Sequence, residues 1–393
     1  MANLVKVASA TFVAEVTRIA YYLTKPFFKK RVWLLCETQT QAQENGYELF
    51  LWLKQHAKDI DARYVIDRHS PSISQFDNDK EWLALGSFRQ LFYMYHAEAI
   101  ISTHGLWMLP NELGLLKKLT LKTLKAKRVM LNHGIGFFKN GKDFYHKSIF
   151  TLNDLFLSAS AKEKSIFVEE YGYKDSEVSI TGYPRFDSLV DTSNESKWSN
   201  LVLYMPTFRD KEQKLGDKFK ETDLFKHTRD MLCSLEINKS LQENDAHIAI
   251  YLHQNIQHYS KYFDEYTSER VHIIRQGEFS VTQLLKMAKL LVTDYSSVVC
   301  DFVYMDKPFI SYQFDYDKFV GARKHKAFID IRTELPGYVV TQLAQLEETI
   351  ALVFAESFTL PNEHKEKIKD YFTFQDRENC RRVYQAINDF CKT

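Results

Sequence analysis

Residues 290–309 read LLVTDYSSVVCDFVYMDKPF. The apolar run at residues 290–292 predicts a buried strand, and the polar residues 293–297 (TDYSS) separate it from an apolar stretch typical of a helix, which residues 307–308 (KP) end. Asp294 can cap this helix, and the first turn offers unpaired N–H groups, so the segment can bind an anion. An ordinary capped helix would show the same pattern.

Short apolar runs alternate with helical patterns along the whole chain, which predicts an α/β fold with parallel sheets. Moderately long helices fit between the runs, for example at residues 46–56, 162–171 and 281–288. Ligands of such sheets bind at the carboxyl ends of the strands. The candidate strands are residues 32–36, 63–66, 99–102, 127–131, 155–158, 178–181, 201–204, 247–252, 271–274, 290–292 and 309–312.

The candidate strands fall into two groups, separated by the polar stretch 191–199 (DTSNESKWS), which predicts a linker. We therefore expect an amphipathic N-terminal segment at residues 1–31 and a Rossmann-like domain at residues 32–190. A second Rossmann-like domain with C-terminal helices is expected at residues 200–393. The residues from 363 onward form one or two helices that could cross back to the first domain.

Composition narrows the class of protein. An apolar content of 45% with 26% charged residues is that of a globular protein able to bury sizeable cores. The net charge of +1 argues against nucleic acid as a partner. Five scattered cysteines without paired spacing indicate reduced thiols in a cytosolic protein, and neither a zinc site nor a disulfide framework.

Two segments have the pattern of membrane-surface helices. Apolar residues recur at helical spacing over residues 5–23 and are followed by a basic cluster at residues 25–31, but no run is long enough to span a bilayer. Residues 117–128 contain six basic residues and no acid, interleaved with leucines. Either segment could lie on an anionic membrane; the first could instead pack on the core, and the second could be a solvated helix face.

Three histidines follow candidate strands. His104 lies in STHG, His133 in NHGIG and His253 in LHQN. A single histidine at a strand end is more often structural than catalytic, but three in such loops favour a functional role. Histidine can move a proton near neutral pH or stabilise a phosphoryl oxygen. Gly134 would let the backbone approach a ligand closely.

These segments resemble the CDP-glycerol glycerophosphotransferase family, which comprises teichoic acid and capsule polyol-phosphate transferases. The ordered co-occurrence of the motifs, from about residue 32 to about residue 330, makes the resemblance specific. The motifs are residues 132–134 (NHG), 180–187 (ITGYPRFD), 204–209 (YMPTFR), His253 and 293–297 (TDYSS), with 301–302 (DF) and 307–308 (KP).

The resemblance implies two facing Rossmann-like domains of GT-B type, with no metal and no cofactor. The implied reaction transfers glycerol phosphate from CDP-glycerol, or another CDP-polyol, to a lipid-linked or oligosaccharide acceptor and releases CMP. His133 would be the general base, and His253 would hold the pyrophosphate or assist the leaving group. The residues implied in donor binding are Gly134, Arg185, Arg209, Asp294, Tyr295, Ser296 and Ser297, although both arginines could be structural ion-pair residues. The enzyme would be cytoplasmic, peripheral on the inner face of the cell membrane.

Several alternatives remain open from the sequence. The donor could be CDP-ribitol, and a GT-B glycosyltransferase would use a nucleotide sugar. A non-catalytic binding module is a third class, which retention of both histidines and both serines disfavours. Residues 77–79 (DND) and 315–317 (DYD) have the spacing of metal-binding DxD motifs, although the first suits a solvated turn better.

Overall fold

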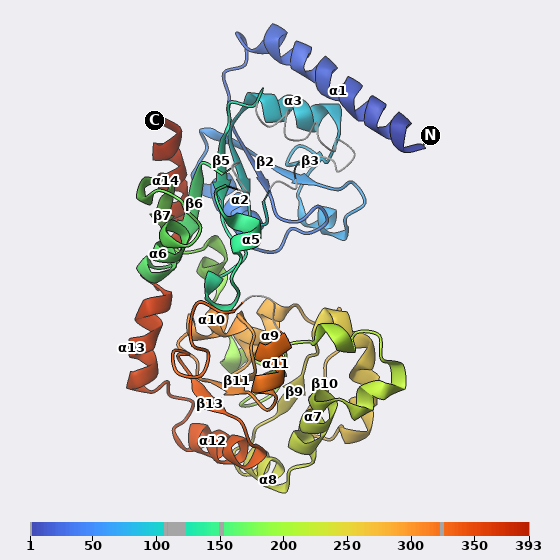
Figure 1. Ribbon diagram of the computed structural model, residues 1–393, viewed down its shortest axis with the longest axis vertical. Helices are drawn as coiled ribbons and strands as arrows, with labels where there is room; N and C mark the ends of the chain where they lie inside the picture. The colour runs from blue at the N-terminus through green and yellow to red at the C-terminus, as the bar shows by residue number, and fades with distance from the viewer. Residues whose placement is uncertain (1, 106–107, 109–122, 149–152, 323–325, 393) are drawn as a thin grey trace. The chain divides into compact units, whose positions relative to one another are not determined.

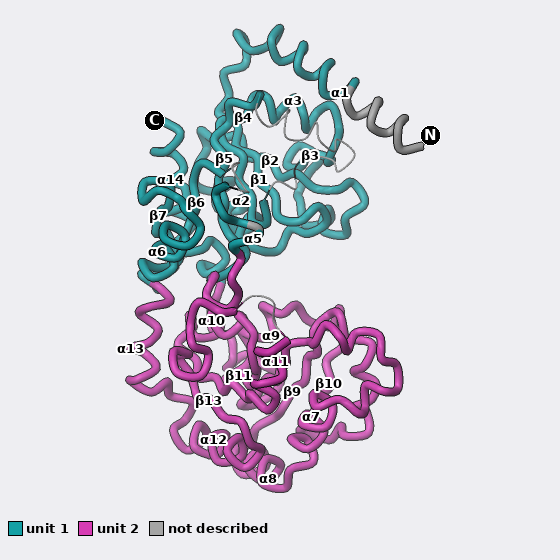
Figure 2. Tube along the Cα trace, viewed as in Figure 1, with its two compact units in different colours: residues 1–135, 142–188, 373–393 teal, residues 136–141, 189–372 magenta. Residues whose placement is uncertain are grey.

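The computed structural model describes residues 2–105, 108, 123–148, 153–322 and 326–392. It consists of two compact units (Figure 2). Unit 1 contains residues 1–135, 142–188 and 373–393, and unit 2 contains residues 136–141 and 189–372. Each unit has its own parallel sheet, covered by helices.

Unit 1 is built on a seven-stranded parallel sheet in the order β3-β2-β1-β4-β5-β6-β7. The strands are β1 (Arg31–Cys36), β2 (Ile60–Ile66), β3 (Trp82–Ala84), β4 (Ala97–Ser102), β5 (Lys127–Met130), β6 (Leu155–Ser158) and β7 (Val178–Ile180). Its longer helices are α1 (Ala2–Thr24), α2 (Asn45–His56), α3 (Phe88–His96), α6 (Ala161–Glu169) and α14 (Asn379–Lys392), with a short α5 (Lys142–Tyr145).

The central strand β1 shows why this sheet is covered on both faces. Trp33 and Leu35 pack into a core with α2 and α14, whereas Val32 and Leu34 pack into a second core with α3. All four side chains are fully buried. A strand buried on both faces reads as a continuous apolar run, which is the pattern seen in the sequence.

Unit 2 is built on a six-stranded parallel sheet in the order β10-β9-β8-β11-β12-β13. The strands are β8 (Val202–Met205), β9 (Ile248–Ile250), β10 (Val271–Ile273), β11 (Leu290–Thr293), β12 (Phe309–Tyr312) and β13 (Tyr338–Val340). The helices are α7 (Asp223–Cys233), α8 (Leu235–Glu243), η9 (Gln254–Tyr266), α9 (Val281–Met287), α10 (Val298–Val303), α11 (Tyr316–Ala322), α12 (Leu343–Ala355) and α13 (Asn362–Tyr371).

The expected α/β fold with parallel sheets is confirmed, and all eleven candidate strands are present within a few residues of their expected bounds. The sequence did not indicate β3 and β13. Both are three-residue strands at an edge of a sheet, with two of three residues only half-buried. Such strands lack the continuous apolar run of a central parallel strand.

The C-terminal helix α14 belongs to unit 1, so its assignment to the second domain was wrong (Figure 1). Asp187 holds the start of this helix, because its carboxylate accepts hydrogen bonds from the backbone N–H groups of Asn379 and Cys380 at 2.9 and 2.7 Å. Val383 and Ile387 then bury their side chains in the core beside α2. The residues from 363 onward were expected to cross back to the first domain, and those from Thr373 do so, whereas α13 (Asn362–Tyr371) remains in unit 2.

Residues 117–122 of the basic segment at residues 117–128 lie outside the described residues, and residues 124–128 are not helical. Lys127 and Arg128 open strand β5, and Arg128 forms a bidentate ion pair with Asp154. A basic helix through residue 128 is therefore wrong at its C-terminal end. Among the described residues, none of the helices has the length and apolar character required to cross a bilayer.

Candidate functional site

Charged side chains at the ends of three neighbouring strands in unit 2 pair with one another. Arg209, Asp294 and Asp315 follow β8, β11 and β12. The guanidinium donates to Asp294 Oδ2 at 2.8 Å and to the two oxygens of Asp315 at 2.9 and 2.8 Å. Burial opposes the charge of Arg209, but the carboxylates, Asp294 foremost, more than compensate and raise its pKa. The network ties three strand ends together.

Asp294 was expected to cap the following helix, and that expectation is wrong. Its Oδ1 accepts hydrogen bonds from the backbone N–H groups of Thr207 and Tyr295 at 2.8 and 2.6 Å, while Oδ2 faces Arg209. Only 1% of its side chain is exposed. The N-cap position of α10 is instead Ser297, whose side chain makes no capping hydrogen bond. A buried guanidinium is a stronger partner for the carboxylate than a helix end.

Tyr295 packs beside the network of Arg209, Asp294 and Asp315. Its ring stacks on Phe319 with centroids 3.8 Å apart, and its hydroxyl donates to Asp315 at 3.0 Å. Burial, with the neighbouring carboxylates Asp315 and Asp294, raises the pKa of Tyr295. The side chain therefore supports the charged network, although it lies beside the expected donor-binding serines.

The two serines are the accessible part of the turn. Ser296 is half-buried and Ser297 is exposed, in contrast to the buried Asp294 and Tyr295 beside them. Ser296 Oγ accepts a hydrogen bond from the backbone N–H of Val298 at 3.3 Å. Four residues of this turn were expected to bind the donor. Only the two serines among them are accessible to solvent.

His253 follows β9, which pairs with β8 in the sheet. Its Nδ1 accepts a hydrogen bond from the backbone N–H of Asn255 at 3.2 Å, and its ring packs on Phe208 with centroids 4.3 Å apart. A nitrogen that accepts from a backbone N–H carries no proton, so the neutral ring must hold its hydrogen on Nε2. Burial lowers the pKa of His253 and favours this neutral form. His253 thus presents a hydrogen-bond donor.

Two buried oxygens near this network had no signal in the sequence. Among the described residues, Thr207 Oγ1 and Glu212 Oε2 are buried without a hydrogen-bond partner. Burial raises the pKa of Glu212 to about 7, with Arg209 acting in the opposite direction. The run RDKE at residues 209–212 resembles a solvated turn, and only the fold brings its glutamate beside the buried carboxylates.

In unit 1, a left-handed turn places His133 beyond the end of β5. Asn132 has φ 63°, a conformation that asparagine tolerates better than most residues. Its side-chain amide donates to the carbonyl of Leu157 and to the hydroxyl of Tyr183, both at 3.2 Å. The hydrogen bonds of the Asn132 side chain therefore stabilise the turn. The next side chain, His133, remains 62% exposed.

His133 lies in a cluster with groups from other strand ends. Its Nδ1 is 2.7 Å from Glu44 Oε2, and its ring centroid is 4.5 Å from that of His104. The guanidinium of Arg185 donates to the backbone carbonyl of His133. A Cβ on Gly134 would lie 3.3 Å from Arg185 Nη2, so glycine leaves room for this guanidinium.

The electrostatics of the cluster favour an ionised Glu44. Burial penalises its charge, but the hydrogen bond with His133 and the charges of His133, Arg185 and His104 outweigh burial and lower the pKa of Glu44. Burial, followed by the charge of His133, lowers the pKa of His104. An anion in contact with an exposed imidazole can stabilise that imidazole as it takes up a proton.

The chain matches a known family over most of its length. The sequence pattern described as CDP-Glycerol:Poly(glycerophosphate) glycerophosphotransferase matches residues 17–389. The chain belongs to this glycerophosphotransferase family.

Individual relatives are distant and longer. The minor teichoic acid biosynthesis protein GgaB of Bacillus subtilis (strain 168) is 24% identical over 392 residues, covering 96% of this chain and 42% of GgaB. A teichoic acid glycerol-phosphate transferase of Staphylococcus aureus (strain NCTC 8325 / PS 47) is 24% identical, covering 60% of each chain. Other relatives are named as ribitol-phosphate polymerases. This chain thus spans roughly half the length of the curated relatives it matches.

The fold of this family member is also that of a solved structure. The wall teichoic acid polymerase TagF superposes with a TM-score of 0.69 at 15% identity, covering 99% of this chain and 98% of that chain. The expected GT-B-like α/β fold is therefore confirmed, as is the presence of an N-terminal helix.

One set of side chains in this family member meets the spacing of a metal site. One ligand atom from each of Glu44, His104 and His133 lies within 4.8 Å of the others. The sequence could not indicate this set, because its members follow three different strands. Two imidazoles and a carboxylate suit a transition metal, whereas the adjacent positive charge of Arg185 opposes one. The same arrangement suits a hydrogen-bonded acid–base pair without a metal.

The two DxD sequences differ in their surroundings. Asp315 is occupied by Arg209 and by the hydroxyl of Tyr295, so its carboxylate is part of the buried network. Asp77 is 80% exposed and pairs with Lys54, in agreement with a solvated turn. In each sequence one carboxylate is thus already paired with a cation, which opposes a DxD metal site.

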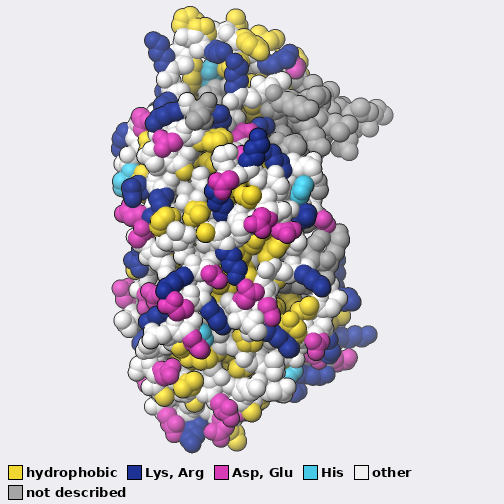
Figure 3. Space-filling view, turned by 60° about the vertical axis from the view of Figure 1, so that its left-hand side comes forward, with side chains coloured by type: hydrophobic (Ala, Val, Ile, Leu, Met, Phe, Trp, Pro, Cys, Tyr) yellow, Lys and Arg dark blue, Asp and Glu magenta, His cyan; other side chains and the backbone are white. Residues whose placement is uncertain are grey.

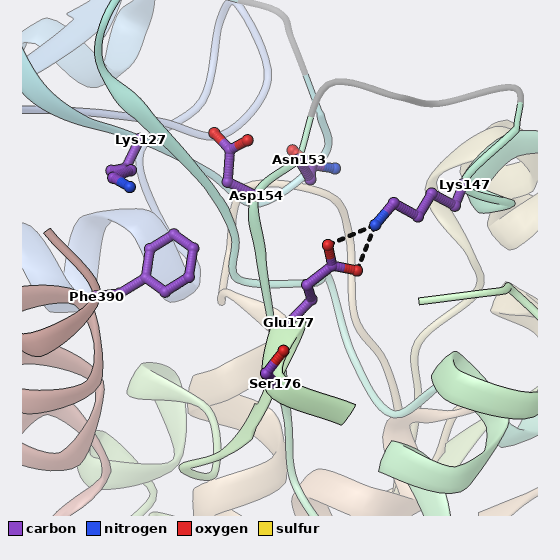
Figure 4. A pocket seen from close by; sticks show the side chains of 7 residues that line it. All are labelled: Lys127, Lys147, Asn153, Asp154, Ser176, Glu177 and Phe390. Atoms are coloured by element: carbon purple, nitrogen blue, oxygen red, sulfur yellow. Dashed lines mark hydrogen bonds and ion pairs between the residues drawn. The ribbon is translucent and has the colours of Figure 1, made fainter. Parts of the chain in front are cut away.

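A pocket of about 490 Å³ lies elsewhere in unit 1 (Figure 4). Its charged groups are largely paired: Lys147 with Glu177, and Asp154 with Arg128. Lys127 lies over the ring of Phe390. None of the expected site residues lines it. The lining residues are Lys127, Lys147, Asn153, Asp154, Ser176, Glu177 and Phe390.

Proposed function

We propose that this protein transfers glycerol phosphate from CDP-glycerol to an acceptor hydroxyl, with release of CMP, in teichoic acid or capsule polymer synthesis. The observation that carries the proposal is membership of the glycerophosphotransferase family over residues 17–389. The site geometry supports it, because His133 and His253 each follow the carboxyl end of an interior strand of a parallel sheet, where such folds bind ligands.

Each histidine has a distinct proposed role. His133, exposed and paired with Glu44, accepts the proton of the acceptor hydroxyl through Nε2. His253, neutral and holding its hydrogen on Nε2, donates a hydrogen bond to the diphosphate and so stabilises the charge that develops on the leaving CMP. The exchange is balanced: the acceptor oxygen bonds to the β-phosphorus, the bond to CMP breaks, and the proton goes to His133.

The remaining donor-binding roles follow from accessibility. Ser296 and Ser297 remain open to solvent and are proposed to donate to the diphosphate. Arg185 and Gly134 shape the turn that carries His133. Because Arg209 is saturated by two carboxylates, we propose that it supports the serine turn rather than contacting phosphate itself.

Variants of the two groups separate these roles. Replacing His133 by Ala should abolish CMP release while leaving donor affinity largely unchanged, since the base acts only in the transition state. The double variant Ser296→Ala/Ser297→Ala should weaken donor binding. Near-normal turnover by His133→Ala would refute the assignment of the base.

The donor is the first property to measure. Relatives are named for both glycerol-phosphate and ribitol-phosphate polymers, so CDP-ribitol is the alternative donor. We would titrate the protein by calorimetry with CDP-glycerol, CDP-ribitol and UDP-N-acetylglucosamine, each in the presence of EDTA. Tight binding of CDP-glycerol alone supports the proposal. Preference for the UDP-sugar would favour a glycosyltransferase, and tight binding without turnover a non-catalytic binding module.

We also propose that α1 holds the protein on the inner face of the cell membrane. Ala14, Thr17 and Tyr21 pack toward unit 1, whereas the opposite stripe is exposed. Figure 3 shows apolar and basic side chains gathered at this end of unit 1. Such a stripe can enter the headgroup region while lysines contact anionic lipid. The exposed apolar residues of the helix are Phe12 (70%), Val16 (38%), Ile19 (59%), Tyr22 (67%) and Leu23 (70%), and Phe27 (82%) is exposed in the turn that follows.

Vesicle co-sedimentation tests the membrane proposal. The protein should pellet with phosphatidylglycerol vesicles more than with phosphatidylcholine vesicles. Ile19→Asp/Leu23→Asp should abolish pelleting without unfolding, because both side chains already face solvent. Leu235→Asp is the matched control, since Leu235 is 84% exposed in unit 2. Equal pelleting of all three proteins would contradict the proposal. A membrane position would suit a lipid-linked or oligosaccharide acceptor.

A further inference from the structure

We infer that Glu44 is the positioning residue of the general base: its carboxylate fixes the tautomer and the orientation of His133. The inference rests on the function proposed above. Glu44 Oε2 lies 2.7 Å from His133 Nδ1, a normal length for a charge-assisted hydrogen bond. Packing alone cannot orient this imidazole, because 62% of the side chain is exposed. The carboxylate supplies the constraint that packing does not.

Glu44 is itself anchored. Its backbone N–H donates to Glu37 Oε1 at 2.7 Å. The next residue, Asn45, is fully buried. Its side-chain amide donates a hydrogen bond to the carbonyl of Asn132 at 2.8 Å and accepts one from the backbone N–H of Arg185 at 3.0 Å. The segment that carries the carboxylate is thus fastened to the turn that carries the imidazole. The pair is assembled before any substrate binds.

The hydrogen bond determines which ring nitrogen is basic. An ionised carboxylate can only accept, so Nδ1 of His133 must carry the hydrogen. A neutral imidazole has one hydrogen, which leaves the lone pair of Nε2 free to take the acceptor's proton. Proton transfer then produces an imidazolium beside the carboxylate, and Glu44 stays ionised and stabilises it.

The other charged groups around the pair support this role for Glu44. Arg185 and His104 approach from two other strand ends, and a positive charge on either disfavours an imidazolium. Burial raises the pKa of Glu37 to about 7, although three backbone N–H groups act in the opposite direction. Glu44, whose pKa is lowered, therefore carries the more persistent negative charge beside the ring.

The test compares Glu44→Gln with Glu44→Ala by CMP release across pH. The glutamine can still accept from Nδ1 but has no charge. We expect Glu44→Gln to lower kcat by about 10- to 100-fold with KM for CDP-glycerol within about twofold, because only the transition state is affected. The acidic limb of its pH–kcat profile should move to lower pH, because the Glu44 carboxylate that favours the imidazolium is no longer present. Glu44→Ala should lower kcat further, because alanine cannot accept the hydrogen bond from Nδ1 at all. The control is Glu363→Gln, since Glu363 pairs with the neighbouring His364 in helix α13 of unit 2.

A purely structural role for Glu44 would not move the pH profile. Wild-type kcat and an unmoved acidic limb in a folded Glu44→Gln protein, checked by near-ultraviolet circular dichroism, would overturn the inference. A readout independent of turnover is the ¹⁵N NMR spectrum of the His133 ring. The wild type should show the Nδ1–H tautomer and Glu44→Gln a mixture; identical spectra would overturn the inference even if no CDP-polyol is a substrate.

A metal reading of the same side chains makes the opposite prediction. If Glu44 served with His104 and His133 as a ligand, the enzyme would bind Zn²⁺ tightly in calorimetry, lose turnover in EDTA, and lose Zn²⁺ affinity equally in His104→Ala. That set of results would overturn the positioning role. Full turnover in EDTA, with the pH shift confined to the Glu44 variants, would support it.

Discussion

Arg209 and Asp294 form an ion pair of 2.8 Å whose side chains are only 12% and 1% exposed, and it joins the end of β8 to the end of β11. The same guanidinium reaches Asp315 after β12. Arg209 and Asp294, which both belong to the sequence motifs, thus form a buried ion pair that supports the site. The groups accessible to a ligand are Ser296 and Ser297, which follow Asp294 in the same turn.

Removing the guanidinium should therefore destabilise unit 2. In Arg209→Met, two carboxylates would remain buried without their cation, a change that typically costs about 3–5 kcal/mol. Urea unfolding followed by tryptophan fluorescence measures the loss. Arg381→Met is the control, because Arg381 pairs with Glu378 on the surface and should cost less than about 1 kcal/mol. Equal losses in both variants would contradict the structural role of Arg209.

A buried carboxylate in unit 1 should also be costly to replace. Glu37 Oε1 accepts from the backbone N–H groups of Glu44 and Tyr47, and Oε2 accepts from that of Gln43, at 2.7–2.9 Å. In Glu37→Gln an amide NH₂ must face one of these donors, which should lower stability by about 1–3 kcal/mol. Thermal unfolding checks the loss; an unchanged melting temperature would contradict it.

Gly182 should not tolerate a side chain. Its φ is 72°, and a Cβ there would overlap the buried side-chain amide of Asn379 at the start of α14. We expect Gly182→Ala to destabilise unit 1 by more than about 2 kcal/mol. Gly216→Ala is the matched control, since Gly216 has φ 55° and nothing within 4 Å of its Cβ position. It should cost only about 1 kcal/mol, and a similar loss in both variants would exclude the overlap.

Acid should weaken unit 2 through His272. Burial, followed by the charge of the neighbouring His247, lowers the pKa of His272 to about 4. The unfolded chain takes up this proton near the ordinary histidine pKa of about 6.5, so the stabilisation is present above that pH and is lost as pH falls toward 4. Urea unfolding between pH 7.5 and 4.5 should show a shallower pH dependence in His272→Gln. His69→Gln, at an exposed ring, should keep the wild-type slope.

The strands were predictable because local composition decides them. Central parallel strands are buried on both faces, so β1, β6 and β12 appear as apolar runs in the sequence. The strand-end positions of His133, His253 and the turn at residues 293–297 followed from the same runs. The edge strands β3 and β13 were missed because half-burial leaves no such run.

The partners of these residues were not predictable. Glu44, His104 and Arg185 meet His133 only because parallel strands bring their carboxyl ends to one edge of a sheet. Asp294 suited a helix cap by its position in the sequence, but the fold offered it a buried arginine from another strand.

The sequence by itself therefore determined the α/β class, the family and the loops that carry the chemistry, since these depend on residues close together along the chain. The tertiary structure alone decided which charges pair, which serines stay open, and that α14 returns to unit 1. Those outcomes depend on burial, where an unpaired charge is costly and the nearest opposite charge in space, rather than in sequence, becomes the partner.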